Sequence, residues 1–246
     1  MSIHDFVFWG DYNERIDKLA SLSPEKWSSG DKSDKSILKN YINYTFLKLE
    51  EENKIAETEK YALFNTGLFT EYYEYIYCYM EKNRSEGKQP WYAKDFLTEY
   101  ELGTLGISGL PDRADYFQDP SLLVFDANCK INVQYKHIFN DEENLKRLPE
   151  ALRENKMLPV IFEGAIERMK KRVVANYKIA VPQYYNHTIQ LLLPLSLQEE
   201  DKPDLALVVT KNKTGNFYQA HTCLSLEMAY NNARLIAKPN SNWLEP

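Results

Sequence analysis

Three stretches in the C-terminal part of the chain decide the fold: residues 188–195 read TIQLLLPL, residues 205–211 read LALVVTK, and residues 217–224 read FYQAHTCL. Each is short, apolar and rich in strand-forming residues. The connection at 212–216 reads NKTGN, and its Asn and Gly residues tolerate the backbone of a tight turn. The pattern predicts three strands of an antiparallel meander.

Helices are predicted before and after this meander. Between residues 160 and 180 the apolar residues recur at spacings of three and four, which predicts one buried helical face, and Pro182 is expected to end that helix. Ser225 is suited to cap a last helix that reaches Ala237. A shorter helix is predicted at 144–153.

The first 60 residues read as a helical lobe, with helices expected near 12–22 and 35–52. Further strands are expected downstream of it, at 61–66, 72–80, 122–126 and 131–135. Turns are expected at Asn65-Thr66-Gly67 and at Ala127-Asn128, a charged loop at 81–89, and irregular surface structure at 101–119.

These elements predict the α+β class, with a mainly antiparallel sheet flanked by helices. We find no internal repeat and no convincing linker. We therefore expect one domain over residues 1–246, in which 1–60 form the helical lobe and 61–246 the α+β core.

Charge is distributed unevenly along the chain. The formal net charge is −6, which argues against binding to nucleic acid by charge over the whole surface. Residues 166–246 hold ten Lys or Arg and seven Asp or Glu, a balance of +3, so residues 1–165 carry −9. A face that binds anions is therefore expected in the C-terminal third.

Composition also bears on location and cofactors. Acidic residues interrupt the N-terminal region where a secretory signal needs an apolar run, and the stretch 189–195 is far shorter than the roughly 20 residues of a membrane span. Three widely spaced cysteines indicate buried free thiols. We expect a cytoplasmic protein without membrane association. No metal site is predicted, and no motif assigns a cofactor.

The helix at 160–180 carries a cationic side opposite its apolar face. Positive charge followed by aromatic and amide side chains suits phosphate neutralisation and base stacking. The alternative is an ordinary solvated helix face with an ion pair between Glu167 and Lys171. The residues concerned are Arg168, Lys171, Arg172 and Lys178 on the helix, and Gln183, Tyr184, Tyr185 and His187 after it.

The last predicted helix is apolar on two sides, so its polar residues Asn231, Asn232 and Arg234 are expected to be wholly or partly buried. An unpaired buried polar group costs about 1–3 kcal/mol, so these side chains need partners. They either form an internal network or face a ligand.

Two further groups of residues could carry chemistry. A turn at Asn65 and Thr66 could approach an anion or a ribose, although most such triplets are simple turns. His137, followed by Asn140 and Arg147, offers a general base, an orienting amide and a cation, which are useful in phosphoryl or glycosyl transfer. A lone histidine at a strand end is more often structural.

Several segments together resemble an uncharacterised domain family of prokaryotes. They include ALFNTGL at 62–68, AVPQYY at 180–185, DLALVV at 204–209 and AYNNARL at 229–235. The resemblance spans residues 61–244. Members of that family occur beside OST-type helix-turn-helix and cold-shock modules, so the resemblance implies a role in RNA or nucleotide metabolism. No catalytic residues follow from it.

The leading hypothesis is a domain that binds RNA or a nucleotide. One alternative is an enzyme that acts on a ribose or phosphate group, with His137 or a tyrosine as acid or base. Another is a protein-interaction scaffold, built on the tyrosine-rich strand, with a protein partner or a homo-oligomer. The residues expected to bind the ligand are Lys171, Arg172, Lys178, Tyr184 and Arg234, with directional hydrogen bonds from Asn65, Asn176, Gln183 and Asn231.

Overall fold

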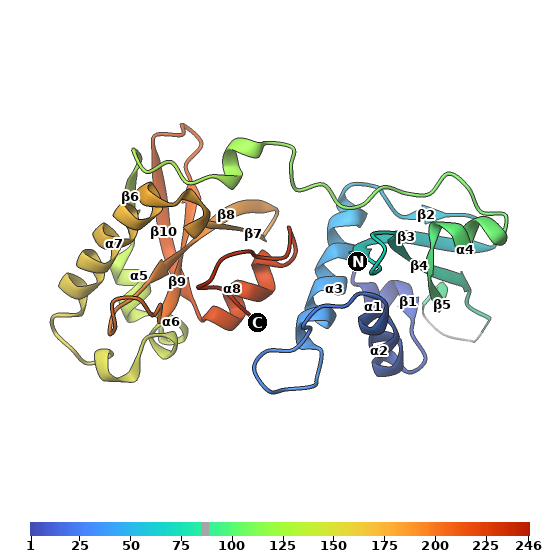
Figure 1. Cartoon of the computed structure of the whole chain (residues 1–246), viewed down its shortest axis with the longest axis horizontal. Coiled ribbons are helices and arrows are strands. Elements are labelled where there is room, and N and C mark those ends of the chain that lie inside the picture. The colour runs from blue at the N-terminus through green and yellow to red at the C-terminus, as the bar shows by residue number, and fades with distance from the viewer. Residues whose placement is uncertain (85–88) are drawn as a thin grey trace. The chain divides into compact units, whose positions relative to one another are not determined.

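The computed structural model describes residues 1–84 and 89–246, so part of the charged loop expected at 81–89 lies outside the described residues. The chain divides into two compact units, Met1–Asp115 (with Pro246) and Tyr116–Glu245. Each unit holds a five-stranded mixed sheet with helices, which confirms the α+β class (Figure 1). The boundary expected at residue 60 falls inside the first unit, between two strands of its sheet.

The first sheet has the order β1-β5-β4-β3-β2, in which β1 pairs with β5 in parallel and the other pairs are antiparallel. The helices expected near 12–22 and 35–52 are confirmed. The elements of this unit are α1 (Ile3–Phe6), β1 (Val7–Phe8), α2 (Tyr12–Leu22), α3 (Ser36–Glu51), β2 (Ala56–Glu57), β3 (Tyr61–Phe69), β4 (Tyr75–Lys82), β5 (Trp91–Thr98) and α4 (Glu99–Thr104).

The two faces of this sheet carry different residues because side chains alternate along a strand. On one face α3 packs against β3, where the rings of Phe46 and Phe64 meet edge to face at 5.6 Å. The other face is rich in tyrosine, and there Tyr77 packs with Leu102 of α4 and with Ile107. The helices α1, α2 and α3, all within residues 1–60, thus belong to a unit that also contains a sheet.

The prediction of a turn at Asn65-Thr66-Gly67 is wrong. These residues lie inside β3, whose pairing with β4 shifts register between Asn65 and Phe69. Gly67 adopts a φ of 72°, which fits such an irregularity within a strand. The chain reverses direction later, at 70–74, where Tyr73 N donates to Thr70 O at 3.0 Å.

The second sheet has the order β6-β10-β9-β8-β7, with β6 parallel to β10 and all other pairs antiparallel. The predicted meander is confirmed with the expected bounds. The elements are η1 (Pro120–Leu123), β6 (Lys130–Val133), α5 (Tyr135–Asn140), α6 (Glu142–Arg147), η2 (Glu150–Leu152), α7 (Leu158–Ala175), η3 (Tyr177–Ile179), β7 (Val181–Tyr185), β8 (Thr188–Leu195), β9 (Leu205–Lys211), β10 (Phe217–Leu224) and α8 (Leu226–Ala233).

Several expectations for this unit are corrected. The strand expected at 122–126 is replaced by the short helix η1, and β6 pairs with β10 instead of with that segment. The helix expected at 144–153 is split into α6 and η2. The long helix ends at Asn176, whose Oδ1 accepts from Lys178 N at 3.1 Å and starts η3. Pro182 therefore lies in β7, an edge strand.

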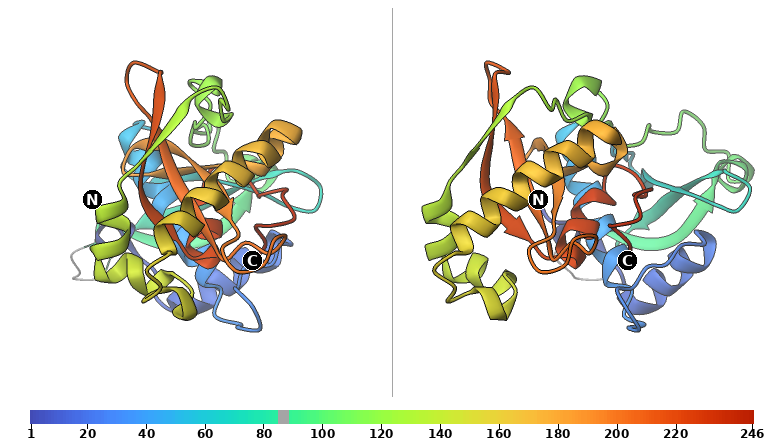
Figure 2. Two further views of the ribbon diagram at one scale, coloured as in Figure 1. Left: turned by 90° about the vertical axis from the view of Figure 1, so that its left-hand side faces the viewer. Right: turned by 60° about the vertical axis from the view of Figure 1, so that its left-hand side comes forward.

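The core of the second unit lies between α7 and one face of the sheet. Phe162, Ile166 and Met169 of α7 pack with Leu193 and Leu207 of the central strands, and all five are buried. Ser225 caps α8 as expected, because its side chain accepts from Met228 N. Figure 2 shows α7 across one face of the sheet and α8 on the other.

We predict that Gly67→Ala destabilises the first unit by about 2–3 kcal/mol. Alanine at this positive φ is strained by about 1–2 kcal/mol, and its Cβ would lie 2.8 Å from the Tyr41 hydroxyl. That hydroxyl is buried and donates to Thr66 O at 2.9 Å, so moving it breaks a hydrogen bond. Urea unfolding measures the change.

The matched control is Gly103→Ala, because Gly103 lies within α4 and a Cβ there meets nothing within 4 Å. Alanine is the better helix former, so the control is expected to hold or raise stability by up to about 1 kcal/mol. Equal effects of the two substitutions would show that the strand irregularity imposes no constraint.

Candidate functional site

A row of polar side chains crosses the second sheet. Gln183 of β7 pairs with Gln190 of β8, Thr210 of β9 pairs with Gln219 of β10, and Gln219 pairs with Asn132 of β6. Gln190 lies opposite Thr210, since the adjacent Leu191 pairs with Val209. One polar residue therefore stands at the same level on each of the five strands.

The row lies on the face of the sheet that α7 does not cover. Leu191, Val209 and Ala220, one position along each strand, belong to the buried core with α7. Side chains alternate between faces, so the polar residues next to them point to the opposite side, where α8 packs.

Hydrogen bonds join the row in one direction. Asn232 of α8 donates to Gln183 Oε1 at 3.1 Å, Gln183 Nε2 donates to Gln190 Oε1 at 2.7 Å, and Gln190 Nε2 donates to Thr210 Oγ1 at 3.0 Å. Gln183 is only 1% exposed, whereas Asn132 at the far end is exposed. The row thus begins under α8 and opens toward β6.

Aromatic and cationic groups lie on the same face as the open part of the row. Tyr185 is two residues beyond Gln183 on β7, and its side chain is 48% exposed. Phe217 of β10 is paired with Lys130 of β6, and these two residues lie two positions from Gln219 and Asn132 on the same strands. The face therefore offers amides, an exposed ring and a cation.

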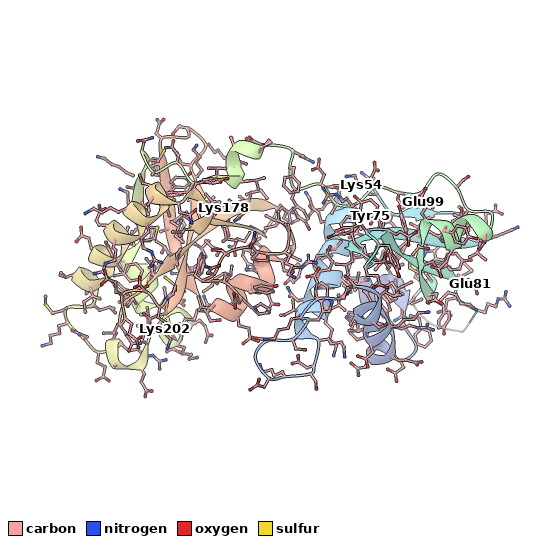
Figure 3. The ribbon with its side chains drawn as sticks, in the orientation of Figure 1. Lys54, Tyr75, Glu81, Glu99, Lys178 and Lys202 are labelled. Carbon is pink, nitrogen blue, oxygen red and sulfur yellow. The ribbon has the colours of Figure 1, made fainter. Side chains whose placement is uncertain are left out.

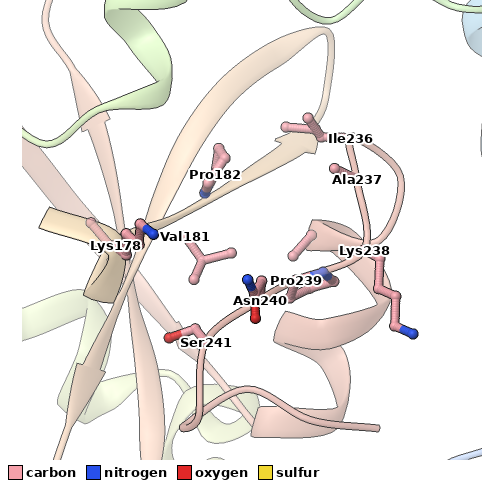
Figure 4. A pocket seen from close by; sticks show the side chains of 11 residues that line it. Lys178, Val181, Pro182, Ile236, Ala237, Lys238, Pro239, Asn240 and Ser241 are labelled. Carbon is pink, nitrogen blue, oxygen red and sulfur yellow. The ribbon is translucent and has the colours of Figure 1, made fainter.

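A pocket of about 150 Å³ lies beside the buried end of the row, between β7 and the loop at 236–241 (Figure 4). Much of its lining is apolar. Two of the lining residues, Val181 and Ala233, lie close in sequence to Gln183 and Asn232, which are joined by a hydrogen bond. Lys178 and Lys238 supply positive charge, and no acidic residue contributes to the described lining. Figure 4 shows the Lys238 chain extending outward, which places its charge at the rim.

Some predicted residues join this site and others do not. Gln183 lies in the polar row, and Lys178 lines the pocket. Tyr184 points to the other face, where its ring meets the ring of Tyr116 edge to face at 5.0 Å. Asn176 is occupied in capping η3.

The polar residues of α8 behave as expected for a buried helix. Arg234 is 6% exposed, and Asn232 holds Gln183 as described above. Asn231 Oδ1 is buried and has no hydrogen-bond partner among the described residues. Of the two possibilities left open for Asn232, an internal network or a ligand, its hydrogen bond to Gln183 fits the internal network and makes it the first member of the row.

Lys171 and Arg172 are separated from this site, because α7 covers the opposite face of the sheet. Glu167 pairs with Lys170 at 3.7 Å, and not with Lys171 as in the alternative interpretation of this helix as a solvated face. Arg168 is likewise paired, with Glu200 at 3.5 Å. Of this cationic side, only Lys178 reaches the pocket.

His137 and Arg147 lie at the other edge of the sheet, where α5 and α6 pack against β10. His137 is on α5 and not at a strand end, and its exposed side chain makes no hydrogen bond or ion pair with the described residues. Arg147 donates from Nη1 to Asn144 Oδ1 at 3.2 Å and to Cys223 O at 2.8 Å. This arrangement is a structural network.

Asn65 and Thr66 belong to the first unit and are both buried. Thr66 Oγ1 donates to Ile76 O at 2.6 Å, so this hydroxyl serves the strand pairing. Asn65 Oδ1 accepts from Gly67 N at 2.9 Å, and Asn65 also lines a pocket of its own unit. Neither residue forms the exposed turn that the sequence led us to expect.

The thiols offer no nucleophile at this site. The three cysteines are free and buried, as expected from their spacing. Burial raises the pKa of Cys223 to about 12, so the thiol stays protonated at neutral pH.

Within residues 1–84 and 89–246, no group of three or more His, Cys, Asp or Glu could hold a metal ion. No helix in those ranges is long and apolar enough to cross a membrane.

We predict that Asn144→Ala lowers the stability of the second unit by about 2–3 kcal/mol, whereas His137→Ala changes it by less than about 0.5 kcal/mol. Asn144 is buried, and its loss removes the acceptor at 2.5 Å of the Thr222 hydroxyl and one of the acceptors of Arg147. Urea unfolding followed by circular dichroism gives both values. A large effect of His137→Ala would contradict the structural assignment of these residues.

Neither the curated proteins nor the solved structures gave a match. A family of domains of unknown function, DUF3825, matches residues 19–243. Because that match covers most of both units, the chain belongs to the DUF3825 family.

Proposed function

We propose that the second unit binds single-stranded RNA or a nucleotide on the face of its sheet that carries the polar row. The observation that carries the proposal is the row itself, with the cationic pocket at one end. The resemblance to domains found beside OST-type helix-turn-helix and cold-shock modules supports the same ligand class and a cytoplasmic role in RNA processing or nucleotide metabolism.

The row suits the edges of nucleic-acid bases. Each glutamine or asparagine offers both donors and an acceptor, as base edges require. The hydrogen bonds of the row also run in one direction: the amide of Asn232 donates to Gln183, and Gln183 donates to Gln190. Gln190 then donates to the Thr210 hydroxyl oxygen, so the hydrogen of that hydroxyl remains free to donate to a ligand. Gln219 and Asn132 make no side-chain hydrogen bond with described residues, and their amides are available to a ligand.

A partly exposed sheet face with aromatic side chains is a common platform for single-stranded RNA, because unstacked bases can lie flat on it. Tyr185 is the exposed ring on this face. Lys178 and Lys238 in the pocket, and Lys130 at the open end, provide charge for phosphates. The enzyme alternative lacks such support, since the exposed side chain of His137 has no hydrogen bond or ion pair with the described residues that would activate it as a base.

The charge of the second unit limits the strength of binding. Residues 116–245 hold 16 Lys or Arg and 15 Asp or Glu, a formal charge of +1. Binding must therefore come from local contacts. With two or three lysines on phosphates, the slope of log affinity against log salt concentration is expected to be about −2 for a single strand.

We predict that Lys178→Glu combined with Lys238→Glu weakens RNA binding by about tenfold or more, because attraction to phosphate becomes repulsion. Fluorescence anisotropy with a labelled single-stranded oligonucleotide measures the affinity. The control is Lys136→Glu with Lys156→Glu, two exposed lysines of the same unit that form no ion pair with described residues. Equal losses in the two variants would mean that only overall charge matters.

We also expect Tyr185→Ala to cost about 1–3 kcal/mol of binding free energy through the loss of one stacked base. The control is Tyr44→Ala, which removes a ring of similar exposure in the first unit. Retained affinity in Tyr185→Ala, with the fold intact by circular dichroism, would rule out this face as the platform.

A further inference from the structure

A line of aromatic rings runs along the first unit from an exposed turn into a pocket. Tyr73 lies in the turn at 70–74 and is 85% exposed. Its ring contacts that of Phe69 at a centroid distance of 6.4 Å, and Phe69 contacts Tyr75 at 4.6 Å and 32°. Tyr75 in turn lines a pocket of about 340 Å³. A ligand on the turn could thus extend one side chain inward.

The pocket has a fixed polar floor. Asn65 and Tyr77 are paired across β3 and β4, and both are buried. Tyr75 and Lys54 line the same pocket, and both are labelled in Figure 3. Lys54 is already paired, since its Nζ lies 2.8 Å from Glu52 Oε2.

Asp112 brings an uncompensated carboxylate to this pocket. It lines the cavity, and it forms no hydrogen bond or ion pair with the described residues. The lining also includes Arg113 and Asp115, so the pocket itself is close to neutral. The sign of the surface around it therefore decides which ligand is favoured.

That surrounding surface is acidic. Ile76 pairs with Thr98, which places the start of α4 beside the start of β4 and near the aromatic turn. The exposed carboxylates there are those of Glu71, Glu74, Glu99 and Glu101. Burial, Glu99 and Asp112 raise the pKa of Tyr77, which agrees with negative charge on two sides of the pocket.

The first unit as a whole also carries a net negative charge. Residues 1–115 hold 14 Lys or Arg and 21 Asp or Glu, a formal charge of −7. This charge repels a nucleic acid and attracts a cation. Tyrosine rings next to carboxylates are favourable surroundings for a guanidinium or ammonium group, which the ring faces also attract.

The backbone at the turn gives separate support. Tyr73 adopts a φ of 62°, a conformation that costs a bulky side chain energy and that glycine adopts freely. The ring is also one of the most exposed in the chain, so burial within its own unit does not offset the strain. Such strain at an exposed aromatic side chain is typical of a binding surface.

We propose that the aromatic turn and its adjoining pocket bind a basic segment of a partner protein, with one arginine or lysine side chain directed between Tyr75 and Asp112. The rings provide stacking surface along the line from Tyr73 to Tyr75, and the carboxylates select for positive charge. This surface is separate from the polar row of the second unit.

The test uses the full-length protein and a fluorescein-labelled peptide of alternating arginine and glycine, with a matched peptide in which glutamine replaces every arginine. Anisotropy is expected to show binding of the arginine peptide that weakens with added salt, and binding of the glutamine peptide at least about tenfold weaker. Equal binding of both peptides, or of neither, would overturn the proposal.

Two variants locate the site. Glu99→Gln with Asp112→Asn is expected to weaken binding of the arginine peptide by about tenfold, whereas the control pair Glu14→Gln with Asp31→Asn, which removes the same charge from exposed positions elsewhere in the unit, leaves it nearly unchanged. An equal loss in both pairs would reduce the effect to overall charge and refute a defined site.

Tyr73→Gly separates binding from folding. Glycine relieves the positive φ, so the melting temperature is expected to hold or rise while peptide affinity falls several-fold. A lower melting temperature with unchanged affinity would show that the ring is structural. A change in oligomeric mass in this variant, measured by light scattering, would identify a second copy of the chain as the occupant and overturn the basic-partner assignment.

Discussion

The pairing register of β8, β9 and β10 is the constraint on which the second unit depends. With Leu191 opposite Val209, and Val209 opposite Ala220, one face of the sheet becomes continuously apolar and accepts α7. The same register must place the intervening polar residues together on the other face. A slip of one residue would bury the polar row against α7, where its amides would lack partners, so core and candidate site are specified by one set of strand pairs.

Sequence patterns were sufficient for elements with a clear local signal. The meander was predicted because each strand is a short apolar run next to turn residues. The long helix, predicted at 160–180 and found at 158–175, was predicted because its apolar positions repeat at three to four residues. The β5 strand was not recognised, since its residues from Trp91 to Thr98 mix charges and aromatic rings without a clear alternation. The turn expected at Asn65-Thr66-Gly67 failed for a related reason: a glycine at positive φ serves a strand irregularity as well as a turn, and only pairing with β4 distinguishes them.

The candidate site shows the same division between local and long-range information. Lys178 was predicted as part of a cationic helix and Gln183 as an amide that follows it. Gln190, Thr210 and Gln219 were missed, since each is a single polar residue in an apolar strand. The pairing register of the strands could have revealed these residues, because aligning the strands through their connecting turns places Gln190, Thr210 and Gln219 in one row. The separation of Lys171 from Gln183 depends on which face α7 covers, and no local pattern carries that information.

The polar row also explains how a buried glutamine can be tolerated near a candidate ligand surface. A buried amide without partners costs about 1–3 kcal/mol, and Gln183 avoids this cost because both its oxygen and its nitrogen are engaged. Those two bonds fix its amide, and the next bond fixes that of Gln190. The interior end of the row is therefore rigid and satisfied, whereas Gln219 and Asn132 at the open end keep their hydrogen-bonding capacity. A ligand on this face would meet amides whose orientation is set from within the fold, which reduces the ordering that binding requires.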